Sequence, residues 1–389
     1  MVAMAKTNVK LYVKISSASN ASNCLEKRAL LLRKLASVGV RGQALMWFTS
    51  YLTGRRICTT VDGVRSSLRP IPSGVPQGSV LGPLLFLLFY RDLPSVVSSS
   101  CAMFADDTLM YDSSCSGSVT QPCCRLAPDL LILGRWATDW STSFNASKSS
   151  HMLMRRQHGV SSSPELVLDS TAIPAVPCTV HLGVHLSSSL SWSAHVAALL
   201  QRVRFKVYML KRLAYRLGSA DVVKRLYLGL VRPSLEYASP VWDACSRADS
   251  LSLERVQLSI ARAVLRRGRR DVSNVSVLSL IGWPTLAWRR QRFKLLLFWH
   301  LLHGGGPPSL QALVPPMVSA RAPYALRNQS SVAFPRCTSS RHRRSFLPSS
   351  VSFWNSFPPS VTSCSSASSF LRSIDAHFHF DRYSFGLLS

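Results

Sequence analysis

Two adjacent aspartates, Asp106 and Asp107, lie between the apolar stretches 102–105 and 109–111. Burying two charged carboxylates is costly unless a metal ion or another cation compensates them. Hard divalent ions prefer oxygen ligands, and two Mg²⁺ ions can activate a primer hydroxyl and stabilise a pyrophosphate leaving group. An isolated Asp-Asp pair is most often a solvated loop, but these apolar flanks favour a buried hairpin turn that seats metal ions for nucleotidyl transfer.

A glycine-containing loop precedes the aspartates along the chain. Glycine lets the backbone approach a nucleotide closely, and glutamine and serine side chains offer hydrogen-bond donors to a base, sugar or phosphate. Such a loop alone indicates only a turn. Followed by the apolar segment 80–90 and then by the aspartates, it predicts a nucleotide or template site whose candidate residues are Gly74, Pro76, Gln77, Gly78 and Ser79.

The chain is strongly basic, with 46 lysines and arginines against 18 acids and a formal net charge of +28. Arginine supplies 36 of these basic residues. This excess predicts salt-dependent binding to a polyanion, above all nucleic acid; the alternatives are a ribosomal-type basic protein or a translated fragment of skewed composition. The basic cluster of Arg266, Arg267, Arg269 and Arg270 could contact a phosphate backbone, direct nuclear import, or form a solvated loop.

Cysteine spacing and hydropathy bear on the compartment. The ten cysteines lack the Cys-x-x-Cys spacing of structural zinc sites and indicate reduced thiols. Residues 1–20 have no continuous apolar core, so no secretory signal is expected. The longest apolar run, 80–90, is too short to span a bilayer. We therefore expect an intracellular protein, nuclear or cytoplasmic, without a membrane partner.

Apolar periodicity predicts the elements around these residues. Helices are expected within 30–52 (two), at 80–90 as a buried helix begun by Pro83, at 126–144, through most of 195–264, and at 286–302 and 366–378, with weaker order beyond Arg266. Strands are expected at 98–111 as a pair joined by the aspartate turn, at 165–168 and at 180–184. In the hairpin 57–64, Asp62-Gly63 is a two-residue turn signal, which favours a turn role for Asp62 over a catalytic one.

Several segments, in this order and spacing, resemble the reverse transcriptase of non-LTR (LINE-type) retrotransposons, in the jockey-like branch. The likeness runs from about residue 30 to about residue 378. The segments that carry it are GVPQGSVLGP (74–83), FADDT (104–108), HLGV (181–184), VRPSLEYA (231–238), LERVQ (253–257), GWPTL (282–286) and FWNSFP (353–358).

The resemblance implies an α+β fold: a right-hand polymerase palm, which is an antiparallel sheet backed by helices, followed by a mainly helical thumb and a C-terminal region. It divides the chain into a non-matching segment 1–29, a partial palm 30–192, a thumb-like region 193–270 and a basic, partly disordered region 271–389. Trp136, Trp140 and Trp242 fall at apolar helical positions, which favours core packing over base stacking.

The resemblance also implies roles and partners. Asp106 and Asp107 would bind two catalytic Mg²⁺ ions, with Mn²⁺ as a substitute, and residues 77–79 would line the incoming nucleotide and the template. Lys148 would stabilise charge or donate a proton at the leaving pyrophosphate; its alternative is a solvated loop lysine. The partners would be an RNA template, a DNA primer and deoxynucleoside triphosphates.

The sequence departs from the family pattern before residue 30. A further catalytic aspartate would fall near Ala18, but residues 1–61 contain a single acid, Glu26. The family's fingers would lie upstream, so we interpret the chain as N-terminally truncated, and its sheet is expected to be incomplete at the centre. Loss of one well-placed electrostatic group commonly costs about 100-fold or more in rate, so we expect little or no polymerase activity from this chain alone.

Three functional interpretations remain open at this point. The first is a reverse transcriptase by descent that is catalytically incomplete. The second is a non-enzymatic nucleic-acid-binding protein that uses the basic thumb and tail. The third is a retroelement relic without a selected function.

Overall fold

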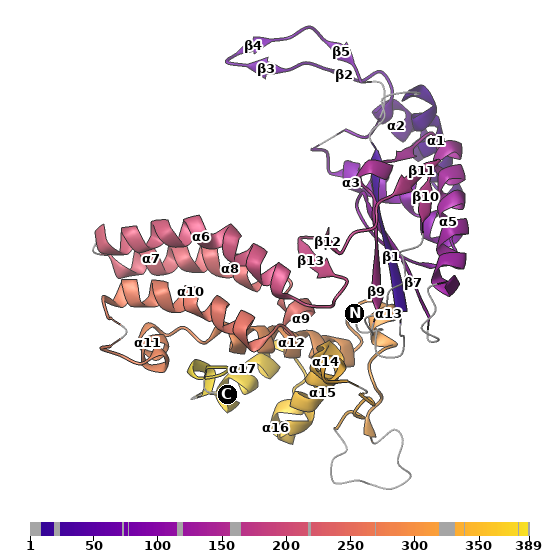
Figure 1. Ribbon diagram of the computed structural model, residues 1–389. Helices are drawn as coiled ribbons and strands as arrows, with labels where there is room; N and C mark the ends of the chain where they lie inside the picture. The colour runs from indigo at the N-terminus through magenta and orange to yellow at the C-terminus, as the bar shows by residue number, and fades with distance from the viewer. Residues whose placement is uncertain are drawn as a thin grey trace. The chain divides into compact units, whose positions relative to one another are not determined.

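The structure of the protein is a computed structural model, and its chain divides into two compact units (Figure 1). One is Thr7–Thr179 and the other contains Val180–Ser389. The domain boundaries expected at 29/30, 192/193 and 270/271 remain predictions. The residues that the structure describes are 9–18, 24–71, 74–76, 78–114, 120–155, 165–216, 219–268, 270–318, 331–337, 339–379 and 381–387.

The first unit is built on an antiparallel sheet with β1 (Val9–Ala18) at its centre. One face of β1 carries Val9, Leu11, Val13 and Ile15, all buried, because alternate residues of a strand point to the same side. The expectation that the sheet is incomplete at its centre is therefore wrong: a strand fills that place. Its neighbours in the sheet are β6 (Ser100–Phe104), β7 (Asp107–Ser114), β8 (Ser143–Phe144) and β9 (Ser150–Arg155).

Helix α5 (Thr120–Asp139) covers the apolar face of this sheet (Figure 1). Leu126, Leu130 and Leu133 are fully buried and belong to the same core as the β1 side chains, which confirms the helical spacing at these positions. The expected extent to residue 144 is wrong, because the helix ends at Asp139 and Ser143–Phe144 form β8. Asp129 on this helix is also buried, and it accepts hydrogen bonds from the backbone N–H groups of Ser98 and Ser99 at 2.9 and 2.7 Å. These bonds fasten the start of β6 to α5.

The two helices expected within 30–52 are α1 (Cys24–Ser37) and α2 (Gly42–Leu52). They pack against α3 (Leu81–Tyr90) through an apolar cluster that includes Leu35, Leu52 and Leu85. Helix α3 is not buried as a whole: Leu84 and Leu87 are 50% and 59% exposed. That part of the expectation is wrong, because only one face of α3 meets α1, and the helix begins before Pro83.

A buried lysine joins three of these helices. Lys34 of α1 donates a hydrogen bond to Asp92 Oδ1 at 2.6 Å and another to the Phe89 carbonyl. Its Nζ lies 3.8 Å from the centroid of a Trp140 ring and 4.7 Å from that of Trp136. Burial lowers the pKa of Lys34, and the bond to Asp92 opposes that shift. The ammonium therefore sits in a cage of two indoles and one carboxylate.

The remaining strands of the first unit form small hairpins. Strand β10 (Leu166–Leu168) pairs with β11 (Thr171–Ile173). A longer ribbon is built from two pairs, β2 (Arg56–Ile57) with β5 (Arg69–Pro70) and β3 (Thr60–Val61) with β4 (Val64–Arg65). Asp62 and Gly63 both have positive φ, 49° and 84°, so Asp62 is a turn residue at the ribbon tip, as the sequence indicated.

The second unit is helical, with a short hairpin of β12 (Cys178–His181) and β13 (Val184–Ser187) at its start. Its apolar core is built around the long helices, with Val203, Tyr227 and Trp242 fully buried. The helices up to residue 281 are α6 (Ser193–Arg216), α7 (Ala220–Leu226), the π-helix η3 (Tyr227–Val231), α8 (Arg232–Glu236), α9 (Ser239–Trp242), α10 (Arg247–Leu265) and α11 (Asn274–Ile281).

The region expected to be weakly ordered contains further helices with a core of their own. Trp288, Phe298, Trp354 and Phe370 pack together there and are buried. The sequence placed α12 and α17 correctly but not the extent of this core. The helices are α12 (Leu286–Leu302), α13 (Pro308–Gln311), α14 (Ser340–Arg344), α15 (Phe346–Ser356), α16 (Pro359–Thr362) and α17 (Ala367–His377). Among the described residues, no helix combines the length and apolarity needed to cross a bilayer.

A polar network lies in the core of the second unit. The Tyr227 hydroxyl donates to Gln257 Oε1 at 2.8 Å, and Gln257 Nε2 donates to Glu254 Oε1 at 2.9 Å and to the Pro284 carbonyl at 3.0 Å. The Leu286 N–H donates to Glu254 Oε2 at 2.8 Å. Burial raises the pKa of Glu254 to about 7, although the bond from Leu286 acts to lower it. Gln257 and Glu254 of α10 thereby join this helix to η3 through Tyr227 and to residues 284–286.

Glu254 should make stability depend on pH. Between about pH 4.5 and pH 7 the unfolded chain loses this proton while the folded chain keeps it, so the free energy of unfolding should fall as pH rises, by on the order of 3 kcal/mol. Urea unfolding from pH 4.5 to 8 measures this. In Glu254→Gln that part of the slope should vanish, whereas Asp221→Asn, at an exposed acid, should keep it; an unchanged slope in Glu254→Gln would refute the assignment.

The Lys34 cage should contribute to stability of the first unit. Lys34→Met keeps an unbranched side chain but removes the ion pair and the cation–π contacts. Because Asp92 is partly exposed and can be rehydrated, we expect a loss of about 1–3 kcal/mol. Thermal unfolding followed by circular dichroism measures the change, with Lys148→Met at an exposed lysine as the control; equal melting temperatures for both variants would contradict the role of the cage.

Candidate active site

The aspartate hairpin is formed by β6 and β7. Ala105, with a φ of 51°, and Asp106 make the turn, and Asp107 is the first residue of β7, paired with Phe104. The expected pair of strands joined at the aspartates is confirmed. Burial is one-sided: Met110 is fully buried, but Phe104 is 63% exposed and Asp106 is exposed. The expectation of a hairpin buried by both flanks is wrong for β6, because it is the edge strand of the sheet.

The end of β1 lies beside the aspartates. In the antiparallel register Ser16 is opposite Asp107, and Ala18 follows two residues later, at a position on the same face of the strand. The place where the family pattern requires a further aspartate is therefore part of the sheet. The sequence of β1, VKLYVKISSA, has no acid. Instead, Lys14 Nζ lies 3.5 Å from Asp107 Oδ2.

The donor set at this end of the sheet does not fit two divalent ions. The two aspartates are adjacent, one in the turn and one on the strand, and a lysine already neutralises part of the charge of Asp107. Across the described parts of the chain, no group of three or more His, Cys, Asp or Glu side chains is gathered as a metal site. Asp106 and Asp107 could together hold one ion, completed by water or phosphate oxygens.

Lys148 lies at the same end of the sheet, on the other side of β1. It closes the short 3₁₀ turn η2 (Ala146–Lys148) between β8 and β9, and its side chain is exposed. Strands β7 and β9 both pair with β1, so their backbones are separated by two strand spacings, about 10 Å. The Lys148 backbone N–H donates to Asn145 Oδ1 at 3.1 Å, which fixes the turn, while the Lys148 side chain is exposed to solvent.

The glycine loop is fastened to the start of α3. Gly74 and Gly78 adopt φ values of +83° and +77°, which favour glycine. The Ser79 hydroxyl donates to the Pro76 carbonyl at 2.7 Å and accepts from the Gly82 N–H at 3.0 Å. The expected contact of Ser79 with a nucleotide would have to replace the bond to Pro76, and it stays a prediction. Gln77 lies outside the described residues.

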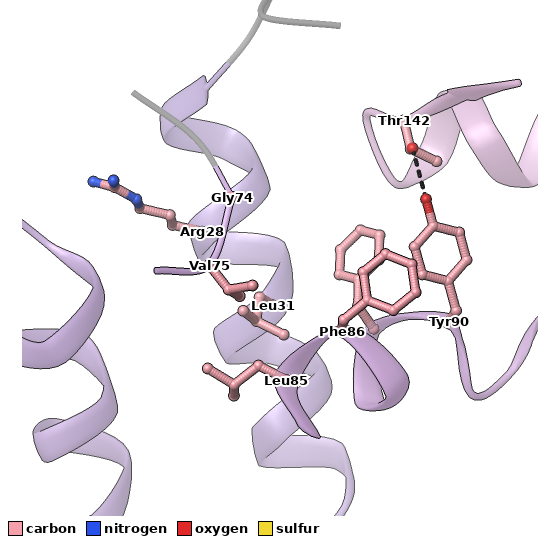
Figure 2. A pocket seen from close by; sticks show the side chains of 9 residues that line it. Arg28, Leu31, Gly74, Val75, Leu85, Phe86, Tyr90 and Thr142 are labelled. Atoms are coloured by element: carbon pink, nitrogen blue, oxygen red, sulfur yellow. Dashed lines mark hydrogen bonds between the residues drawn. The ribbon is translucent and has the colours of Figure 1, made fainter. Parts of the chain in front are cut away.

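A cavity of about 150 Å³ lies behind this loop (Figure 2). Its walls are mostly apolar, and the Tyr90 hydroxyl meets Thr142 Oγ1 at 3.2 Å on one side. Figure 2 shows Val75, Leu31 and Leu85 on one side and the Phe86 and Tyr90 rings on the other. Val75 of the loop packs against the apolar cluster of α1, α2 and α3 beside the cavity. Apart from Arg28, which is also among its lining residues, the cavity offers little polar surface to recognise a nucleotide.

The other candidates fall into two groups. Trp136 and Trp242 are buried, 5% and 0% exposed, and Trp140 packs against the same core as Trp136, which confirms core roles. The arginine cluster belongs to the second unit. Arg266 adopts a left-handed conformation at the C-terminus of α10, and it is exposed together with Arg267 and Arg270, while Arg269 lies outside the described residues.

Comparison with known proteins bears on this site. A family profile described as "Reverse transcriptase (RNA-dependent DNA polymerase)" matches residues 27–205, a span that contains the glycine loop, the aspartate hairpin and Lys148. Residues 27–205 form a reverse transcriptase domain. The resemblance to non-LTR elements that the sequence indicated is supported by similarity to the polymerases of the X-element and jockey mobile elements.

The relatives are proteins of mobile elements. The chain is 29% identical over 227 residues to a probable RNA-directed DNA polymerase from transposon X-element of Drosophila melanogaster, covering 55% of this chain and 24% of that protein. It is 28% identical over 233 residues to the RNA-directed DNA polymerase from mobile element jockey of Drosophila funebris, covering 57% and 25%. The chain thus spans about a quarter of the length of these relatives.

Sequence reasoning missed some residues of the first unit. Lys14 went unnoticed because β1 was not expected, although its alternation of apolar and basic residues was a signal. Lys34 gave no signal, since the sequence does not distinguish a buried lysine on a helix from an exposed one. Trp47 of α2 is 53% exposed, whereas its spacing did not distinguish it from a core tryptophan.

The ion pair of Lys14 should limit metal binding. Because an ammonium 3.5 Å from Asp107 Oδ2 competes with a cation, Lys14→Ala should bind Mn²⁺ at least about 5-fold more tightly, which corresponds to the ~1 kcal/mol of such a pair in water. Electron paramagnetic resonance of free Mn²⁺ measures the affinity. Asp107→Asn should abolish the gain, and Lys224→Ala in the other unit should have no effect. Equal affinities of wild type and Lys14→Ala would show that the pair is irrelevant to the ion.

Proposed function

We propose that the reverse transcriptase domain is the palm of an RNA-directed DNA polymerase by descent, with an incomplete set of metal ligands. The α6–α10 helices would be its thumb. The observation that carries this proposal is the register that puts Ser16 of β1 opposite Asp107. The sheet provides the framework of a polymerase centre, and β1 lacks the acid that the framework needs.

The chain's own residues have separable roles in this proposal. Asp106 and Asp107 bind one divalent ion, Mg²⁺ or Mn²⁺, which would supply charge neutralisation for nucleotide phosphates. Lys148 offers a positive charge at the same end of the sheet. The backbone at Gly74 and at Gly78 would approach a nucleotide closely, since neither glycine has a side chain in the way.

Charge supports RNA template, DNA primer and deoxynucleoside triphosphates as partners. The net charge of +28 favours a polyanion. Exposed arginines of the second unit, among them Arg202, Arg212, Arg267 and Arg270, would contact phosphates without reading sequence.

A second function is favoured by the ion pair between Lys14 and Asp107. A domain that neutralises its own aspartate and lacks a β1 acid can still bind a template and primer. The second candidate is therefore a nucleic-acid-binding protein without polymerase activity, and it shares every partner except the nucleotide.

Primer extension tests the first proposal against the second. Without a β1 acid, the wild-type chain should extend a DNA primer on an RNA template no faster than Asp106→Ala. Ala18→Asp should raise the rate by about 100-fold or more if the framework is otherwise intact, and Ala18→Asn, of similar size but uncharged, should not. Robust wild-type synthesis would overturn the incomplete metal set, and an inactive Ala18→Asp that binds template normally would favour the second function.

A further inference from the structure

An exposed stack of planar side chains lies on α2. The rings of Trp47 and Tyr51 are parallel, 5.2 Å apart with an angle of 9°, and the Arg55 guanidinium lies 4.5 Å from the Tyr51 centroid. The Arg55 Nε also donates to the Tyr51 carbonyl at 2.7 Å, which fixes the guanidinium over the ring. Trp47 is 53% exposed, so the stack presents an indole to solvent.

The core accounts for Tyr51 but not for the exposure of Trp47. Leu45, Phe48, Tyr51 and Leu52 pack in the cluster that joins α2 to α1 and α3. Trp47 lies one turn before Tyr51 and meets the edge of Phe48 at 5.1 Å, but it is 53% exposed, so the core holds Tyr51 and leaves the outer face of the Trp47 indole uncovered. A half-exposed tryptophan held rigidly by its neighbours is unusual on a surface that needs only solubility.

The stack leads directly into an arginine-rich ribbon. Figure 1 shows β2, β3, β4 and β5 extending beyond α2 as a two-stranded arm. All residues from 61 to 70 are exposed. The segment 46–71 contains one acid, Asp62, and four arginines, Arg55, Arg56, Arg65 and Arg69, a net charge of +3.

The ribbon also has a register shift. Ile57 pairs with Arg69 and Thr60 with Arg65, so two residues on one strand oppose three on the other, which is a β-bulge that increases the local twist. The shift makes self-pairing of two ribbons unfavourable, and their like charges would repel. A polyanion is the better complement to this arm.

We propose that the α2 stack and the β2–β5 ribbon bind single-stranded RNA, with an unpaired base on the outer face of Trp47 and phosphates along the arginines. Stacking requires an unpaired base, because in a duplex both faces of each base are covered. This inference rests on the proposed function for the choice of RNA, and it adds a contact surface that the aspartate site does not include.

Fluorescence anisotropy with a labelled single-stranded RNA, without metal or nucleotide, tests the inference. Trp47→Ala should weaken binding roughly tenfold, the usual effect of one stacked base, and Trp47→Phe should restore part of it. Met46→Ala is the matched control, since Met46 is 72% exposed on the same helix but has no planar face. Arg65→Gln with Arg69→Gln should reduce the slope of log K against log salt concentration by about 1.4, because each phosphate contact to a single strand contributes about 0.7.

Three results would overturn the inference: unchanged affinity in Trp47→Ala, an equal loss for duplex RNA, or tighter binding and a larger effect with single-stranded DNA. Circular dichroism verifies that each variant is folded. Primer extension by Ala18→Asp reports separately on the proposed function: loss of extension with intact RNA binding rejects the polymerase, and loss of the Trp47 effect with intact extension rejects this surface.

Discussion

The antiparallel pairing of β1 with β7 and β9 sets the positions of Asp106, Asp107 and Lys148 in the first unit. Through it, the aspartate turn and the Lys148 turn lie at one end of the sheet, on either side of the same strand. The buried face of β1 anchors this arrangement to α5. A change in the register of β1 by one residue would turn Lys10, Tyr12 and Lys14 toward the α5 core in place of Leu11, Val13 and Ile15, and it would separate these groups at once.

Electrostatics at this end of the sheet has been inverted relative to what metal chemistry requires. Polymerase chemistry needs negative charge to gather cations, yet the strand next to Asp107 contributes a lysine. An ion pair between neighbouring strands is compatible with the backbone geometry of the sheet. The proposed function therefore separates the sheet, which is present, from its metal ligands, which it takes to be incomplete.

The sequence allowed good prediction wherever periodicity decided the outcome. Helices α5, α6 and α12, the turn at Asp62 and the aspartate hairpin followed from spacing and turn chemistry. Prediction failed where long-range contacts decide. Strand β1 was not predicted, because its lysines obscured the alternation of its apolar residues. The burial of α3 depends on its contact with α1 rather than on its own apolar content. The Lys34 cage joins residues up to 106 positions apart, and none of their local sequences indicates a buried cation. The order of residues 339–379 was underestimated, because their high serine and proline content drew attention away from the aromatic side chains that form a core.

The network of Tyr227, Gln257 and Glu254 has a consequence beyond stability. Tyr227 of η3, the Pro284 carbonyl and the Leu286 N–H are all hydrogen-bonded to Gln257 or Glu254 of α10. Apolar contacts would permit α10 to slide along its neighbours at little cost, whereas a displaced network would leave several buried polar groups unsatisfied. The network therefore fixes the alignment of α10 relative to its neighbours in the second unit. It follows that the arginines on the surfaces of these helices lie at a fixed spacing.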